Sequence, residues 1–134
     1  FSHAHLLEIA DDIRALPVPL VVDHMGWPDL SLGVANPGFQ ALLRLLDEGR
    51  VYVKLSGVYR LCDAPFEAAA PFVEALVAAN PERCLWGSDW PHLMLGHAPK
   101  PDAGVLLNAF LGMVPGEDAR RRILVEAPEG LFGF

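Results

Sequence analysis

The chain has 134 residues, of which 52% are apolar, and its formal net charge is −7. This length supports one ordinary domain with a core, and the apolar content argues against a disordered chain. The acidic balance argues against a nucleic-acid partner, and no apolar run approaches the ~20 residues of a membrane span, so a membrane partner is not expected either.

Helical and extended patterns alternate along the chain. Five segments show helical spacing of apolar residues or helix-start signals: residues 4–15, a segment that begins at 36–37, and 68–79, 103–112 and 117–125. Pro71 fits the first turn of the third helix, or kinks it. Three apolar runs between the helices predict strands buried on both faces, at residues 18–23, 51–56 and 83–88.

The alternation is typical of an α/β fold. The predicted strands begin near residues 18, 51 and 83, so one unit takes about 32 residues, and eight units approach the ~250 residues of a (β/α)8 barrel. A doubly wound sheet shows the same alternation. The polar residues favour the barrel, because each strand ends in side chains suited to chemistry: His24, then residues 56–60, then Asp89.

The third predicted strand ends in Leu-Trp-Gly-Ser-Asp-Trp-Pro-His, residues 85–92, which places the Asp89 carboxylate between two tryptophans. Burial beside bulky aromatic rings raises the pKa of a carboxylate and makes it a useful proton acceptor near neutral pH. We therefore interpret Asp89 as a general base that activates water. The alternative is a structural turn residue, since Asp-x-Pro is common in turns.

The second predicted strand divides into a polar and an apolar face. Tyr52, Lys54 and Ser56 share one face, which suits a barrel interior near its mouth. Lys54 and Ser56 either line a site there or form a polar layer inside the barrel. Three further residues are candidates for the wall of a substrate pocket: Tyr59, Trp90 and His92. His92 has two other interpretations, as a residue that orients Asp89 and as a simple turn residue.

Three motifs resemble those of the amidohydrolase superfamily, in its amidohydrolase-related branch, and within it those of 2-pyrone-4,6-dicarboxylate lactonases. They are Val-Asp-His-Met-Gly at 22–26, Val-Lys-Leu-Ser-Gly-Val-Tyr-Arg at 53–60, and residues 85–92. The resemblance implies that the three strands are the sixth, seventh and eighth of a (β/α)8 barrel. It also implies an upstream His-x-His pair. We do not interpret His3 and His5 as that pair, because they open a helix.

The resemblance implies a role for each of three residues. Asp89 takes a proton from water, His24 polarises the scissile carbonyl, and Arg60 binds a carboxylate of a small anionic substrate. The expected activity is hydrolysis of a carboxylated lactone in aromatic compound degradation, without a metal cofactor. For His24 the alternative is a structural role, because a histidine at the end of a strand is often only hydrogen-bonded to its surroundings. For Arg60 the alternative is a solvated surface charge, as is usual for an arginine in a loop.

Other interpretations of the function of the chain are also open. In a metal-dependent hydrolase or decarboxylase of the same superfamily, His24 and Asp89 would bind a divalent ion such as zinc. A sugar lactonase would take a neutral substrate. Residues 1–134 are expected to be the C-terminal fragment of a single barrel domain, inactive alone, with the missing N-terminal part as a partner. Two cysteines form no disulfide framework, so a cytoplasmic setting is expected.

Overall fold

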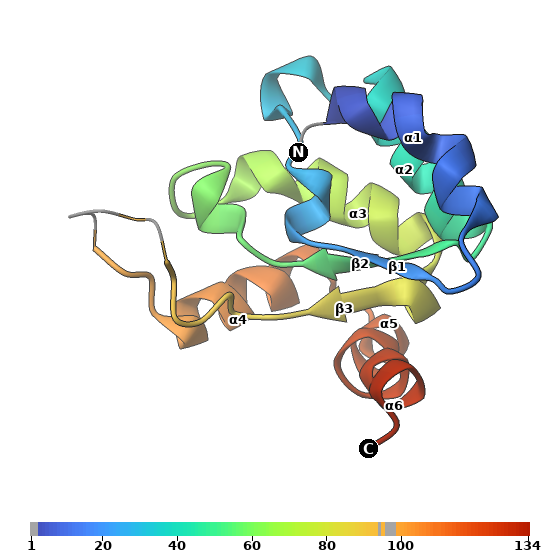
Figure 1. Cartoon of the computed structure of the whole chain (residues 1–134). Coiled ribbons are helices and arrows are strands. Elements are labelled where there is room, and N and C mark those ends of the chain that lie inside the picture. Colours follow the sequence, from blue (N-terminus) through green and yellow to red (C-terminus); the bar gives the residue numbers. More distant parts are fainter. Residues whose placement is uncertain (1–2, 94, 96–98) are drawn as a thin grey trace.

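A three-stranded parallel sheet forms the centre of the chain in a computed structural model, which describes residues 3–93, 95 and 99–134 (Figure 1). The strands are β1 (Leu20–Val22), β2 (Val51–Leu55) and β3 (Cys84–Trp86), in the order β1-β2-β3. All three predicted strands are present: β2 is one residue shorter than the apolar run that predicted it, and β1 and β3 each take up half of theirs. Because neighbouring strands are consecutive in sequence and parallel, their carboxyl ends meet at one edge of the sheet.

Helices connect and cover the strands as the alternation predicted. The helices α1 (His3–Ala15), α2 (Pro37–Asp47) and α3 (Ala70–Ala79) lie together on one side in Figure 1. The helix α4 (Ala103–Met113) follows β3. Pro71 lies in the first turn of α3, one of its two predicted places. Within the described ranges, no helix is both long and apolar enough to cross a lipid bilayer.

The main hydrophobic core lies on one side of the sheet, and on the opposite face Leu85 of β3 is also buried. Along β2, Val51, Val53 and Leu55 are buried against the helices, whereas Tyr52 and Lys54 on the opposite face are partly exposed. This is the predicted division of the strand. In the core, the ring of Phe39 in α2 packs edge-on against that of Phe72 in α3, with centroids 4.9 Å apart. The polar face of β2 is thereby left for a site.

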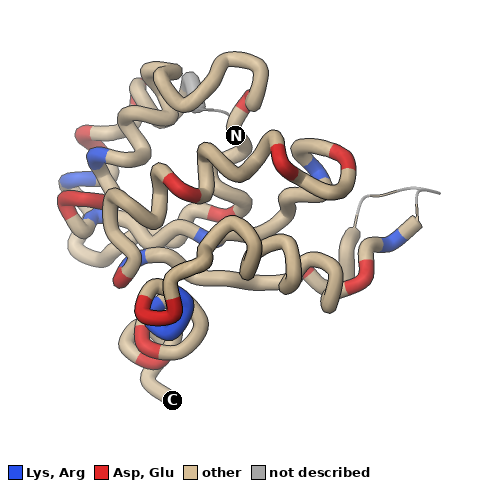
Figure 2. Tube along the Cα trace, turned by 180° about the vertical axis from the view of Figure 1, so that it is seen from behind, with Lys and Arg blue, Asp and Glu red and all other residues tan. Residues whose placement is uncertain are grey.

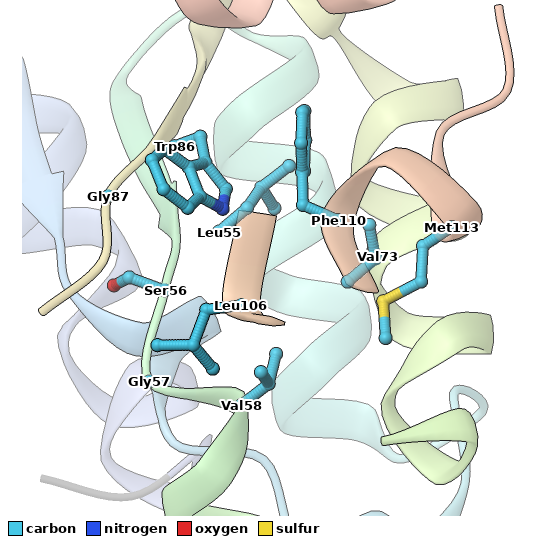
Figure 3. Close-up of a pocket in the computed structure, with 10 residues that line it drawn as sticks. All are labelled: Leu55, Ser56, Gly57, Val58, Val73, Trp86, Gly87, Leu106, Phe110 and Met113. Carbon is cyan, nitrogen blue, oxygen red and sulfur yellow. The ribbon is translucent and has the colours of Figure 1, made fainter. Parts of the chain in front are cut away.

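The helix α4 closes the core over the ends of β2 and β3. Its residues Leu106, Phe110 and Met113 face Trp86 and Leu55 across a cavity of about 10 Å³, which is no larger than one water molecule (Figure 3). The rings of Trp86 and Phe110 lie 6.0 Å apart. The Trp86 indole is therefore part of the apolar packing under α4.

The last helical segment is longer than predicted. The helix α5 (Glu117–Arg121) continues through a π-helical turn (Arg122–Glu126) into α6 (Ala127–Phe132). The predicted helix ended at 125. Beyond it, Pro128 lacks an N–H group and its ring clashes with the preceding turn, so it conflicts with a regular α-helix. The π turn resolves the conflict, because the Ala127 N–H reaches back to Arg122 O and Pro128 falls in the first turn of α6.

Most charged residues belong to the helices and the connecting turns (Figure 2). Arg14 of α1 pairs with Glu48 at the end of α2, with 2.7 Å between Nε and Oε2, and also with Asp11. Exposed pairs of this kind contribute about 0–1 kcal/mol. The packing of α1 on α2 therefore depends mainly on buried apolar side chains such as Leu6 and Ile13.

Removing one of these apolar side chains is expected to cost more than removing the ion pair. Leu6→Ala should lower the free energy of unfolding of the full-length protein by about 2–5 kcal/mol, because Leu6 is fully buried. Glu48→Gln should change it much less, because solvent screens this exposed pair. Urea unfolding measures both. Equal losses in the two variants would show that the ion pair, not the apolar contact, holds α1 in place.

Candidate active site

The predicted site residues converge at the carboxyl ends of the three strands. His24 begins a short 3-10 turn (His24–Gly26) directly after β1, Ser56 follows β2, and Asp89 follows β3. These residues line a cleft of about 390 Å³ together with Lys54 and Trp90, and α6 closes one side through Pro128 and Phe132. The parallel register thus brings residues separated by more than sixty positions into one site.

Each oxygen of the Asp89 carboxylate has a different environment. Oδ2 accepts a hydrogen bond from the Tyr59 hydroxyl at 2.6 Å and one from Arg60 Nε at 2.7 Å. Oδ1 faces His24 Nε2 at 3.7 Å, which is too long for a direct hydrogen bond. A single water molecule can contact both atoms at that separation, because it donates a hydrogen bond to Oδ1 and accepts one from Nε2. Asp89 therefore has one restrained oxygen and one oxygen available for chemistry.

The predicted direction of the Asp89 pKa was wrong. Burial alone would raise the pKa, as the sequence suggested, but hydrogen bonds from Tyr59 and Arg60 and the electrostatic influence of His24 and Arg60 together lower it below its ordinary value. The flanking tryptophans do not enclose the carboxylate, since Trp86 packs under α4 and Trp90 is 79% exposed. At neutral pH Asp89 is accordingly ionised and able to accept a proton.

Tyr59 and Arg60 keep their protons under all ordinary conditions. Burial and the hydrogen bond to Asp89 raise the pKa of Tyr59 to about 12. The hydrogen bond to Asp89 likewise raises the pKa of Arg60. Both groups are thus permanent donors to Oδ2. The sequence assigned Tyr59 to the pocket wall and missed this contact, which joins residues 30 positions apart.

Arg60 is bound to the protein itself in this structure. Besides its bond to Asp89, its Nη2 donates to the carbonyl of Leu93 at 2.8 Å. The guanidinium lies 5.1 Å from the centre of the Tyr59 ring and 5.9 Å from that of Trp27. The prediction that Arg60 binds a substrate carboxylate stays a prediction. Its observed contacts make it first a partner of Asp89.

Trp27 is a site residue that the sequence reasoning missed. Its ring meets His24 edge-to-face at 5.1 Å and also lies beside Arg60. It therefore contacts the histidine and the arginine at the same time. The available signal was its position, one residue after the Val-Asp-His-Met-Gly motif.

Three other predicted residues occupy different places. Lys54 lies in the cleft and pairs with Asp23, with 2.7 Å between Nζ and Oδ1. Trp90 lies at the open side of the cleft. His92 is only 5% exposed, contacts the carbonyl of Ser88 through Nε2 at 2.9 Å, and packs edge-on against Tyr59. His92 therefore supports the turn that carries Asp89, one of its alternative roles, and its substrate contact stays a prediction.

Backbone strain is concentrated in the two turns that carry His24 and Asp89. Six non-glycine residues with a described conformation have positive φ, and all but Phe66 lie in these turns: His24, Met25, Trp27, Asp89 and His92. Each such conformation costs of order 1–3 kcal/mol, and strained residues cluster at functional sites. The hydrogen bonds from Tyr59 and Arg60 help to hold the turn of Asp89 in place, and the contact with Ser56 holds His24.

The fold and the site define an α/β protein with an acid–base cluster at the carboxyl ends of parallel strands. The chain belongs to the amidohydrolase family, because a family model described as Amidohydrolase matches residues 1–134. This confirms the family that the three motifs indicated.

Named relatives within this family act on lactones. The chain is 35% identical to the 4-sulfomuconolactone hydrolase of Hydrogenophaga intermedia, with 99% of the chain aligned to 45% of that protein. It is 39% identical to the D-galactarolactone isomerase of Agrobacterium fabrum (98% and 46% covered). It is 33% identical to the 2-pyrone-4,6-dicarboxylate hydrolase of Comamonas testosteroni (98% and 47% covered). The chain spans about half the length of these relatives.

A solved structure agrees with the fold. All of the chain matches 48% of an apo protein from Agrobacterium tumefaciens, with a TM-score of 0.87 and 35% sequence identity. The sheet and helices of the chain are therefore shared with a longer protein.

Removing the Tyr59 hydroxyl is expected to raise the Asp89 pKa. The pKa of Asp89 is lower in the folded protein than in the unfolded chain. Asp89 therefore stabilises the fold at pH values above its ordinary pKa, and this stability is lost as the pH falls through the folded-state pKa. The unfolding free energy of Tyr59→Phe should therefore fall below that of wild type near neutral pH, and the difference should shrink in acid. The measurement is urea unfolding as a function of pH.

The matched control is Tyr52→Phe, because Tyr52 lies on β2, the strand that precedes Tyr59, where its ring contacts Arg83 and not Asp89. The difference in unfolding free energy between Tyr52→Phe and wild type should be the same at neutral and acidic pH. A Tyr59→Phe difference that is equally independent of pH would contradict the assigned hydrogen bond.

Proposed function

We propose that the protein containing this chain hydrolyses a lactone that carries carboxylate groups, with Asp89 as the general base. The observation that supports this most is the geometry of the Asp89 carboxylate, in which Oδ2 is held by two donors and Oδ1 faces His24 across 3.7 Å. Two of the named relatives are lactone hydrolases, which supports the same reaction class.

The reaction follows from these two groups. Asp89 Oδ1 removes a proton from a water molecule, and the water oxygen attacks the carbonyl carbon of the lactone. His24 Nε2 donates a hydrogen bond to the oxyanion that forms, aided in the whole protein by the expected upstream histidine pair. The tetrahedral intermediate then collapses, the ring C–O bond breaks, and Asp89 returns the proton to the leaving oxygen. One water is consumed and Asp89 regains its starting state.

Positive charge in an acidic chain indicates where an anionic substrate would bind. Lys54 lines the cleft and Arg60 lies behind Asp89, whereas the chain as a whole carries a net charge of −7. A carboxylate held by Arg60 would bind in the plane of its guanidinium, at N–H groups that Asp89 and the Leu93 carbonyl do not already use. These two cations favour a carboxylated substrate over a neutral sugar lactone.

A lactone isomerase is a second candidate, favoured by the 39% identity to a D-galactarolactone isomerase. In that reaction Asp89 would deprotonate a substrate hydroxyl in place of water, and the ring would re-form without net consumption of water. Reaction in ¹⁸O-labelled water separates the two. Hydrolysis places one labelled oxygen in the product, and intramolecular isomerisation places none.

We also propose that β1, β2 and β3 are the sixth, seventh and eighth strands of a (β/α)8 barrel. The support is the one-step parallel order of the strands, the site at their carboxyl ends, and the coverage of about half of each relative. The upstream strands would complete the barrel and supply the expected His-x-His pair. Residues 1–134 alone would then lack lactonase activity.

The contacts of Asp89 favour a reaction without a metal ion. A metal would need His24 and Asp89 as ligands, but Oδ2 already accepts two hydrogen bonds and the Arg60 guanidinium opposes a nearby divalent cation. The proposed reaction therefore has no step that involves a metal.

Asp89→Asn should lower kcat for lactone hydrolysis by the full-length protein at least about 100-fold, because an amide cannot accept the proton from water. The matched control is Asp102→Asn, at the exposed N-cap of α4, where asparagine caps equally well. A steady-state assay with carboxylated lactones measures both variants. Retention of wild-type turnover by Asp89→Asn would exclude its role as the base.

Removal of divalent ions should leave activity within about twofold of the untreated protein, since the proposed base needs no activated metal-bound water. The measurement is lactone hydrolysis after dialysis of the full-length protein against a chelator, with the residual metal content determined. Loss of activity that zinc restores would support the metal-dependent alternative.

A further inference from the structure

The His24 ring has a hydrogen-bond partner on the side opposite Asp89. Its Nδ1 lies 2.9 Å from the hydroxyl oxygen of Ser56, the residue directly after β2. Ser56 is only 5% exposed, and the His24 side chain is 15% exposed. The contact is thus largely shielded from water, and it joins the ends of two adjacent strands.

The surroundings of the ring indicate where its proton lies. A neutral imidazole carries one N–H donor and one acceptor nitrogen, and its partners determine which is which. Asp89 is ionised and can only accept hydrogen bonds, so its Oδ1 at 3.7 Å favours the proton on Nε2. Nδ1 is then the acceptor, and a serine hydroxyl can donate to it.

The backbone beside Ser56 is shaped to fit this ring. Gly57 has φ +67, and a Cβ atom at this position would lie 2.6 Å from His24 Nδ1 and 2.9 Å from Cγ. Any other residue would therefore clash with the imidazole and adopt an unfavourable conformation. Trp27 contacts the same ring edge-to-face. The ring is thus in contact with the Ser56 hydroxyl, the Gly57 backbone and the Trp27 indole.

We infer that Ser56 is a positioning residue for His24, whose hydroxyl donates to Nδ1 and keeps the N–H group on Nε2, directed to where a substrate carbonyl would bind. This assignment deepens the proposed lactone hydrolysis and rests on it for its catalytic consequence. Its structural part, the hydrogen-bonding state of the ring, does not depend on the reaction. Ser56 touches no reacting atom in this account.

The first test is the state of the ring in the wild-type full-length protein. Long-range ¹H–¹⁵N correlation spectra of imidazole-labelled protein distinguish the Nε2–H form from the Nδ1–H form. At a pH where His24 is neutral, the Nε2–H form should predominate. In Ser56→Ala the spectrum should shift towards a mixture of the two forms. A wild-type ring in the Nδ1–H form would overturn the assignment, whatever the activity.

The second test separates kcat from KM. Ser56→Ala should lower kcat about tenfold with KM changed less than about twofold, a loss typical of an outer hydrogen bond that orients a histidine. Ser56→Thr, which keeps the hydroxyl, should restore most of the kcat. Ser31→Ala, an exposed serine that bonds only to Asp29 among the described contacts, is the matched control and should match wild type.

The outcomes distinguish this inference from the proposed function. An active wild type whose Ser56→Ala variant keeps full kcat and an unchanged ring spectrum would overturn the role of Ser56 alone. A wild type that hydrolyses no carboxylated lactone would overturn the proposed function, while the spectra would still test the ring. If Ser56→Ala does not fold, the wild-type spectrum and Ser56→Thr still decide the question.

Discussion

The hydrogen bonds that Tyr59 and Arg60 donate to Asp89 Oδ2 are the contacts on which the rest of the site depends. They join the turn after β2 to the turn after β3, and they place a carboxylate with 19% exposure beside two permanent donors. Hydrogen bonds to a charged group contribute about 1.5–3 kcal/mol each. That is the size of the strain carried by a positive-φ residue such as Asp89. Without these bonds the carboxylate would be a poorly solvated charge on a strained turn.

The same contacts give the two carboxylate oxygens of Asp89 different roles. With Oδ2 restrained, Oδ1 is directed to His24, and the ring of His24 is in turn fixed by Ser56 and the bare backbone of Gly57. A base with a lowered pKa is a weaker proton acceptor but is fully ionised at neutral pH. The geometry therefore favours a base that is fully ionised at neutral pH over a base that binds a proton more strongly. Catalysis would then depend on how well water and the lactone carbonyl are positioned.

Much of this arrangement was predictable because it depends on local patterns and on one geometric rule. Apolar runs gave the strands, and parallel strands must bring His24, Ser56 and Asp89 to one edge. The partners of Asp89 were not predictable in the same way, because Tyr59 and Arg60 lie about thirty residues away and on a turn whose direction no periodicity determines. The predicted rise of the Asp89 pKa was wrong for that reason. The sequence shows the tryptophans beside Asp89, but it does not show that Tyr59 and Arg60 donate hydrogen bonds to the carboxylate. The π turn before Pro128 was missed because proline normally ends a helix.

The most direct test of the central claim is the pKa of Asp89 itself in the wild-type full-length protein. Selective ¹³C labelling of aspartate carboxyl carbons, with Asp89→Asn to assign the signal, gives this value by NMR titration. The account predicts a pKa below the ordinary value of 3.8, because Tyr59 and Arg60 stabilise the charged form. A pKa above that value would contradict it, and would mean that burial, not hydrogen bonding, governs the carboxylate.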